Sequence, residues 1–300
     1  MTHIRNWALA GAATSGLLAL HGQAAAQTSP TGIALGDEGS TLSFMGTYFL
    51  DYLGVAPDAF IGEGIQPSED EDGFGIDLSF LRQTMSGVTY GAHIGYRNGT
   101  GGTDFAIAEG GDTLSFNSDG DFNQFVLDGD IGQVIDLGSG IGLRLYGGLR
   151  FTWIDLDQTV TVQKNGGAAG NSQSLNVTTL GFGPRIGASM RVPLGGERDA
   201  FFFQADTALA GLIGFRDTTV SVTSFGGPGP GSKSFDLPDD TTFIGNAEAS
   251  AGFGANFGGI EVVIGYRVEH WSDVIGTSFS KTGSDVTGHG PFFEVTVPLN

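Results

Sequence analysis

Apolar and polar residues alternate with a period of two along most of the chain. In residues 141–157, for example, Leu145 and Leu149 share one face, and Arg144 and Arg150 share the other. A β-strand turns successive side chains to opposite faces, whereas an amphipathic helix places apolar residues three or four positions apart. Because the sequence has no sustained helical stripe, the pattern predicts an all-β chain.

The alternating runs are long enough to form membrane-spanning strands. A tilted strand needs roughly 9–11 residues to cross a bilayer. We predict ten strands, over residues 40–52, 74–82, 88–97, 121–134, 141–157, 174–192, 200–216, 241–257, 260–272 and 285–299. An even number of antiparallel strands is typical of a bacterial outer-membrane barrel.

The connections between these strands alternate in length. Short ones are predicted at 83–87, 135–140, 193–199 and 258–259, and long ones at 53–73, 98–120, 158–173, 217–240 and 273–284. Short periplasmic turns and long outer loops are typical of outer-membrane barrels. A soluble β-sandwich would also alternate, but mid-strand charges on only one face favour an antiparallel transmembrane β-barrel. Aromatic side chains at strand ends, such as Trp153, Phe215 and Trp271, are expected at the membrane interfaces.

The first 26 residues have a different pattern. Arg5 is their only charged residue, and an apolar run of 14 residues covers 7–20. This run is shorter than the roughly 20 residues that a membrane-spanning helix needs. Ala24 and Ala26 precede Gln27 in the spacing of a signal-peptidase site. We therefore predict a signal peptide over 1–26 and an exported barrel over 27–300.

Charge and composition exclude several classes of protein. The chain has 13 Lys and Arg against 33 Asp and Glu, a net charge of -20, which argues against nucleic acid as a partner. It has no cysteine, which excludes disulfides and thiolate-bound metals. Acid-rich segments at 69–73 and 119–121 are expected in solvated outer loops, with weak Ca²⁺ binding as the alternative. We expect no cofactor and no metal.

Three glycine- and aromatic-rich stretches carry a family resemblance. They read GFGPRIG at 181–187, GYRVEHW at 265–271 and GHGPFF at 288–293. In these stretches the chain resembles the Legionella-type major outer membrane protein, or pore-forming outer membrane protein, family. The resemblance implies an outer-membrane β-barrel that forms a pore, with membrane lipid, small solutes and the barrel insertion machinery as partners. Two departures are the absence of the cysteines that cross-link founding members and the non-aromatic C-terminal residue, Asn300.

Five mid-strand polar residues form the candidate functional site: Arg150, Arg185, Asp206, Glu248 and Arg267. On neighbouring strands they would line one level of the lumen, with three arginines against two acids. One interpretation is a constriction that selects solutes by charge. The other is a network of paired charges that fills a narrow lumen, since about eight strands leave room for little beyond side chains.

We predict a porin-like pore for passive diffusion of small solutes, in an oligomeric state that the sequence leaves open. The alternative is a closed structural barrel whose loops bind envelope or host partners. A barrel hydrolase is a minor alternative, and we expect no enzyme because the chain lacks a G-x-S-x-G motif. Its candidate residues would be Asp128, Asp130, His270, Asp273 and His289 with Ser280 or Ser284.

Overall fold

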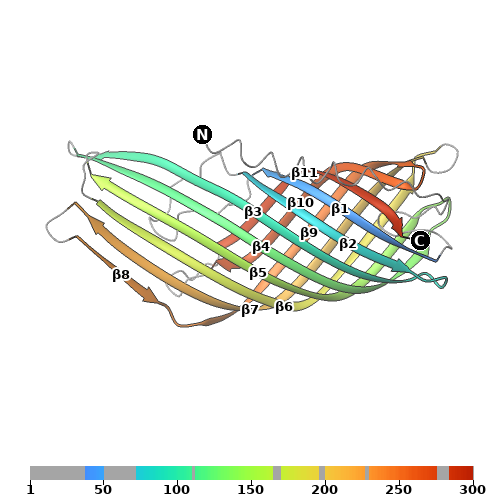
Figure 1. Ribbon diagram of the computed structural model, residues 1–300, viewed down its shortest axis with the longest axis horizontal. Helices are drawn as coiled ribbons and strands as arrows, with labels where there is room; N and C mark the ends of the chain where they lie inside the picture. Colours follow the sequence, from blue (N-terminus) through green and yellow to red (C-terminus); the bar gives the residue numbers. More distant parts are fainter. Residues whose placement is uncertain are drawn as a thin grey trace.

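The strands wind around a barrel in the computed structural model of the protein (Figure 1). The structure describes residues 38–50, 72–109, 112–164, 170–195, 200–226, 230–275 and 284–299. Among these residues no helix is long and apolar enough to cross a membrane. The predicted signal peptide, with Ala24, Ala26 and Gln27 at its cleavage site, lies outside the described residues and stays a prediction.

Eleven antiparallel strands form one sheet. They are β1 (Gly39–Leu50), β2 (Asp72–Gln83), β3 (Val88–Glu109), β4 (Asp112–Asp136), β5 (Gly142–Lys164), β6 (Gly170–Pro193), β7 (Phe201–Phe225), β8 (Gly231–Asp236), β9 (Asp240–Phe257), β10 (Ile260–Ile275) and β11 (Ser284–Leu299). Pairing of β1 with β11 and of β6 with β7 closes the sheet. Within the described residues β8 pairs with β7 alone, so the barrel itself has ten strands and the predicted fold class is confirmed.

Short turns gather at one end of the barrel, where β1 begins and β11 ends. The tightest is the two-residue turn between β9 and β10, in which Gly258 and Gly259 have φ angles of 67° and 100°. Two positive φ angles match the right-handed twist of the flanking strands and favour glycine at both positions. In an outer-membrane barrel this end faces the periplasm.

Three of the predicted outer loops are mostly strand. Residues 98–120, 158–173 and 217–240 were expected as loops, but β3 to β7 continue through most of them and β8 lies in the third. That prediction was wrong because the Ser, Thr and Asp residues there still alternate with valines and other apolar residues, a pattern that suits a paired strand. The acidic segment 119–121 likewise lies in β4.

These continuations project well past the ends of the other strands in Figure 1. We call them the extension, made of the described residues of 101–120, 157–176 and 217–236. β8 is its edge on one side, where the described residues pair it with β7 alone. On the other side, β3 beyond Thr100 pairs with β4 alone in the described part of the chain.

The two faces of the wall differ as the alternation predicts. Leu149 and Ile264 face outward and are 52% and 65% exposed, whereas Arg150, next to Leu149, is fully buried inside. Trp271 was expected at a membrane interface, but it is 1% exposed inside the barrel. That expectation was wrong because Trp271 has the same strand phase as Arg267 and Glu269, which point inward.

Candidate functional site

Charged side chains from β2–β6, β9 and β10 meet in one network inside the barrel. We call this network the belt; its members are Asp77, His93, Arg97, Asp128, Arg150, Arg185, Glu248, Arg267 and Glu269. The most exposed of these side chains, that of His93, is 17% exposed. The belt therefore lies in the lumen, shielded from bulk water.

Glycines in the wall make room for the long arginine side chains of the belt. A Cβ atom on Gly75 would lie 2.9 Å from Cδ of Arg97, and one on Gly95 would lie 2.9 Å from Nη1 of the same residue. Any larger residue at these inward positions would displace the guanidinium group. The sequence thus provides both the charge and the space that the charge occupies.

Arg150 makes the densest set of contacts in the belt. Its Nε lies 2.7 Å from Oδ1 of Asp128 and its Nη2 lies 2.6 Å from Oδ2, a bidentate pair. Its Nη1 donates to Glu248 and to Asn246. Bidentate arginine–carboxylate pairs combine charge attraction with a fixed geometry. Arg150 therefore ties β4 to β9 across the lumen.

Two further arginines share two acids. Arg267 lies 2.8 Å from Asp77 and 3.1 Å from Glu269. Arg97 contacts the same pair of carboxylates at 2.8 and 3.1 Å. Arg267 also lies 3.6 Å from Glu248, which connects this group to Arg150. The network consequently spans the lumen from one wall to the other.

His93 connects the two halves of the belt. Its Nε2 lies 2.7 Å from Asp77 and its Nδ1 lies 3.1 Å from Asp128. A neutral imidazole can donate from only one nitrogen, so both contacts are ion pairs when the ring is doubly protonated. Four arginines and this imidazolium then face four carboxylates.

Four of the five predicted site residues lie in the belt. Arg150, Arg185, Glu248 and Arg267 are together, with Arg185 at 3.8 Å from Glu248 and 3.5 Å from Asp128. Asp206 lies in the lumen but outside the belt. Strand register places Ala208, not Asp206, opposite Glu248, so the carboxylate lies nearer the turn end.

The prediction missed five belt residues: Asp77, His93, Arg97, Asp128 and Glu269. Each of them lies at an inward-facing position of its strand. These strands have few apolar residues at such positions. Asp77, for example, lies between Ile76 and Leu78, which are 41% and 44% exposed on the outer wall. The two-residue alternation identifies such residues as inward-facing. It does not show which of them lie at the same height in the barrel.

Apolar side chains fill the lumen between the belt and the loop end. This outer cluster consists of Phe49, Phe122, Val126, Ile154, Leu156, Leu175, Val177, Ala210, Leu212, Ile244, Trp271, Val274 and Val286, all buried. The guanidinium carbon of Arg150 lies 5.7 Å from the Trp271 ring, and that of Arg97 lies 6.0 Å from Phe49. The cluster thus packs directly onto the belt.

The residues considered for a barrel hydrolase have other partners. His270 donates to or accepts from Thr287 at 2.8 Å and lies 3.8 Å from Asp285. Nδ1 of His289 bonds the hydroxyl of Tyr266 at 2.5 Å. Asp128 and Asp130 form ion pairs with arginines of the lumen, and Ser280 lies outside the described residues. The absence of enzyme activity stays a prediction.

The closed antiparallel barrel with an apolar outer wall defines an outer-membrane β-barrel protein. Over residues 82–298 the chain matches the family described as Legionella pneumophila major outer membrane protein precursor. The chain belongs to this family, and it is a protein of the bacterial outer membrane. The predicted family and location are thereby confirmed.

The chain is also similar to solved structures. The outer membrane protease OmpT from Escherichia coli is 10% identical, covering 90% of this chain and 100% of its own, with a TM-score of 0.32. Ail, the attachment invasion locus protein of Yersinia pestis, is 12% identical over 87% of this chain and 99% of its own, with a TM-score of 0.25. No curated protein sequence matches the chain.

Proposed function

We propose that this protein is a closed structural barrel whose extension binds partners in the envelope or on a host. The observation that carries the proposal is the belt, in which Arg150 is fully buried and held by Asp128 and Glu248. The outer cluster fills the lumen beside it. Together these described residues leave the barrel wall rigid and the extension as the part open to partners.

The energy of the belt supports a closed lumen. Solute passage would require an arginine such as Arg150 to leave its carboxylates. Breaking one buried ion pair costs about 3–5 kcal/mol, and each 1.36 kcal/mol is a factor of ten in population. A spontaneously opened state would therefore be populated about 1% of the time or less.

The outward face of the extension is suited to polar contacts. Hydroxyl pairs run across its strands, with Thr159 3.0 Å from Ser174 and Ser221 3.1 Å from Ser234. Carboxylates such as Asp157 lie in the row nearest the barrel. Paired side chains order this face before any partner arrives, which lowers the entropy cost of binding.

Removing part of the extension tests the binding role. Because Asp157 pairs with Asn176, residues 158–175, which carry the Thr159–Ser174 hydroxyl pair, can be replaced by an Asn-Gly turn without changing the barrel register. We expect the shortened protein to fold but to lose binding to envelope polysaccharide or host-cell membranes. A conservative Thr161→Ser variant serves as the control, and binding that survives the excision would contradict the proposal.

The porin-like pore predicted from the sequence is the second candidate. A cavity of about 160 Å³ on the turn side of the belt favours this candidate. Charged and polar side chains line it, so it could hold an ion on the path through the lumen. Liposomes containing the mature protein, from Gln27 onward, separate the two candidates. A pore admits small sugars and amino acids and the vesicles swell, whereas a closed barrel leaves them unchanged.

A further inference from the structure

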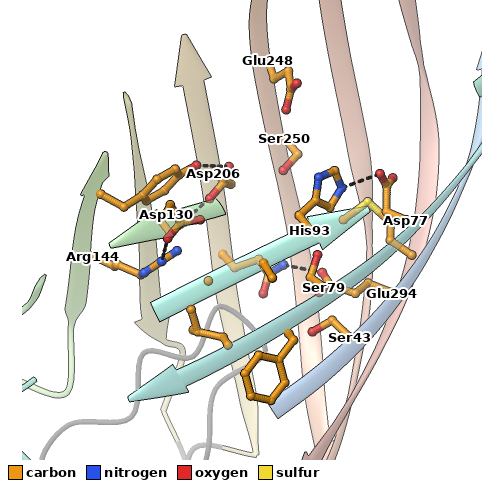
Figure 2. Close-up of a pocket in the computed structure, with 18 of the residues that line it drawn as sticks. Ser43, Asp77, Ser79, His93, Asp130, Arg144, Asp206, Glu248, Ser250 and Glu294 are labelled. Atoms are coloured by element: carbon orange, nitrogen blue, oxygen red, sulfur yellow. Dashed lines mark hydrogen bonds and ion pairs between the residues drawn. The ribbon is translucent and has the colours of Figure 1, made fainter. Parts of the chain in front are cut away.

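The cavity on the turn side of the belt interrupts the packed lumen. Its volume is about 160 Å³, and all ten barrel strands contribute to its lining. Figure 2 shows acidic and hydroxyl side chains pointing into it from several strands. The charged lining residues are the acids Asp77, Asp130, Asp206, Glu248 and Glu294, the arginines Arg144, Arg185 and Arg267, and His93.

Three of the five lining acids have arginine partners. Asp77 lies 2.8 Å from Arg267, and Glu248 lies 3.6 Å from the same residue. Asp130 is in contact with Arg144. Arginines of the barrel strands balance the charge of these three carboxylates, so no ligand is needed to balance it.

The other two acids have only neutral partners. Asp206 accepts hydrogen bonds from the hydroxyl of Tyr146 at 3.2 Å and from Ser189. Glu294, which is 6% exposed, accepts from Nε2 of Gln204 at 3.0 Å. No lysine, arginine or histidine nitrogen of the described residues lies within 4.0 Å of either carboxylate. Burying a carboxylate without a counter-charge is costly, and a proton or a cation bound in the cavity offsets that cost.

Gln204 is a second and independent sign of a ligand. It is 4% exposed and lines the cavity, and its Nε2 is committed to Glu294. Among the described residues, none donates a hydrogen bond to its Oε1. Buried carbonyl oxygens without a donor are rare in folded proteins. An ion or its bound water would satisfy this oxygen.

We propose that the cavity holds a divalent cation of the Mg²⁺ class, held by Asp206 and Glu294 on opposite sides (Figure 2). The lining holds five acids against three arginines and His93, and the groups that Asp206 and Glu294 offer are oxygens, which hard cations prefer. No group of three or more acidic or histidine side chains in the described residues could hold a metal by itself. Mg²⁺ suits such a site because it keeps several waters and binds through one or two carboxylates.

The volume of the cavity agrees with a partly hydrated ion. Because one water needs only about 10–15 Å³ of such space, a cavity of about 160 Å³ holds several water-sized groups. The cation would occupy one of them and its waters the others, within reach of hydroxyls such as Ser43, Ser79 and Ser250. The site does not depend on whether the barrel conducts, so it stands apart from the proposed function.

Calorimetric titration of the refolded mature protein with MgCl₂, after chelator treatment and at fixed ionic strength, tests the proposal. We expect one saturable site that weakens about tenfold or more in Glu294→Gln and in Asp206→Asn. Asp236→Asn is the matched control, since Asp236 is an exposed acid of β8 and lies outside the cavity. Its titration should equal that of the unmodified protein.

Two results would overturn the proposal. One is the absence of a saturable Mg²⁺ site in the unmodified protein, and the other is equal binding by both cavity variants and the control. If a cavity variant fails to fold, the melting temperature of the unmodified protein tests the Mg²⁺ site instead. It rises with added Mg²⁺ but not with matched NaCl if the site exists, and an equal response to both salts contradicts it.

Discussion

The belt and the cavity lie next to each other in one lumen, but acidic side chains have different partners in the two regions. In the belt, Asp128 and Glu269 each contact arginine and are fully buried. In the cavity, Asp206 and Glu294 have neutral partners and face open space. Charge that is paired within the wall serves to close the barrel. Charge that is left unpaired serves to attract a ligand.

Removing an arginine from the belt should have the largest effect. Arg150→Met keeps much of the side-chain length but leaves Asp128 and Glu248 without their main partner. We expect a loss of about 3–5 kcal/mol in the free energy of unfolding. Urea unfolding in lipid vesicles measures it. A loss below about 1 kcal/mol would mean that the belt behaves like a surface ion pair.

A charge placed on the outer face of the same strand sharpens the comparison. Leu149 is next to Arg150 in sequence but faces lipid, where it is 52% exposed. Leu149→Arg should cost about 2–4 kcal/mol because the hydrocarbon offers no carboxylate. Folding yield and unfolding in vesicles report the cost, with Leu149→Val as the control. If the arginine were tolerated as well as valine, the assignment of the two faces would fail.

Neutralising one acid at each level compares them directly. Glu269→Gln removes the charge shared by Arg97 and Arg267 and should cost about 2 kcal/mol. Glu294→Gln removes a buried charge without a cationic partner, so it should leave stability unchanged or raise it when Mg²⁺ is chelated. Unfolding curves of the two variants under one chelated buffer give the difference. Equal costs would remove the distinction between belt and cavity.

An exposed ion pair should give the smallest effect. Arg82 lies 3.6 Å from Glu38 at the turn end, and the two side chains are 59% and 45% exposed. Arg82→Ala should change the free energy of unfolding by less than about 1 kcal/mol, because water and salt screen the pair. The same vesicle assay with Arg150→Met as reference provides the check. A cost comparable to that of the buried arginine would show that burial is not what strengthens the belt.

The direction of each side chain, outward or into the lumen, could be predicted from the sequence. The height along the barrel at which inward side chains meet could not. Alternation correctly separates Leu149 from Arg150, because side-chain direction in a strand is a local property. Which inward residues meet depends on strand tilt and stagger, which closure of the whole barrel determines. For this reason Arg150, Glu248 and Arg267 meet, whereas Asp206 lies nearer the turn end.

The extension escaped prediction for a different reason. Its strands are rich in Ser, Thr, Asn and Asp, which are common in loops. Cross-strand hydroxyl pairs, such as Thr161 with Ser172 at 3.3 Å, form only after neighbouring strands are in register. Composition therefore suggested loops where pairing produced sheet.

Conductance of the mature protein in a planar lipid bilayer tests the closed lumen most directly. We expect the unmodified protein to insert without current steps above the lipid baseline, because the belt and the outer cluster fill the lumen. Arg150→Met, which weakens the belt, serves as the variant most prone to open. Stable, stepwise ion currents from the unmodified protein would contradict the account and restore the pore as its function.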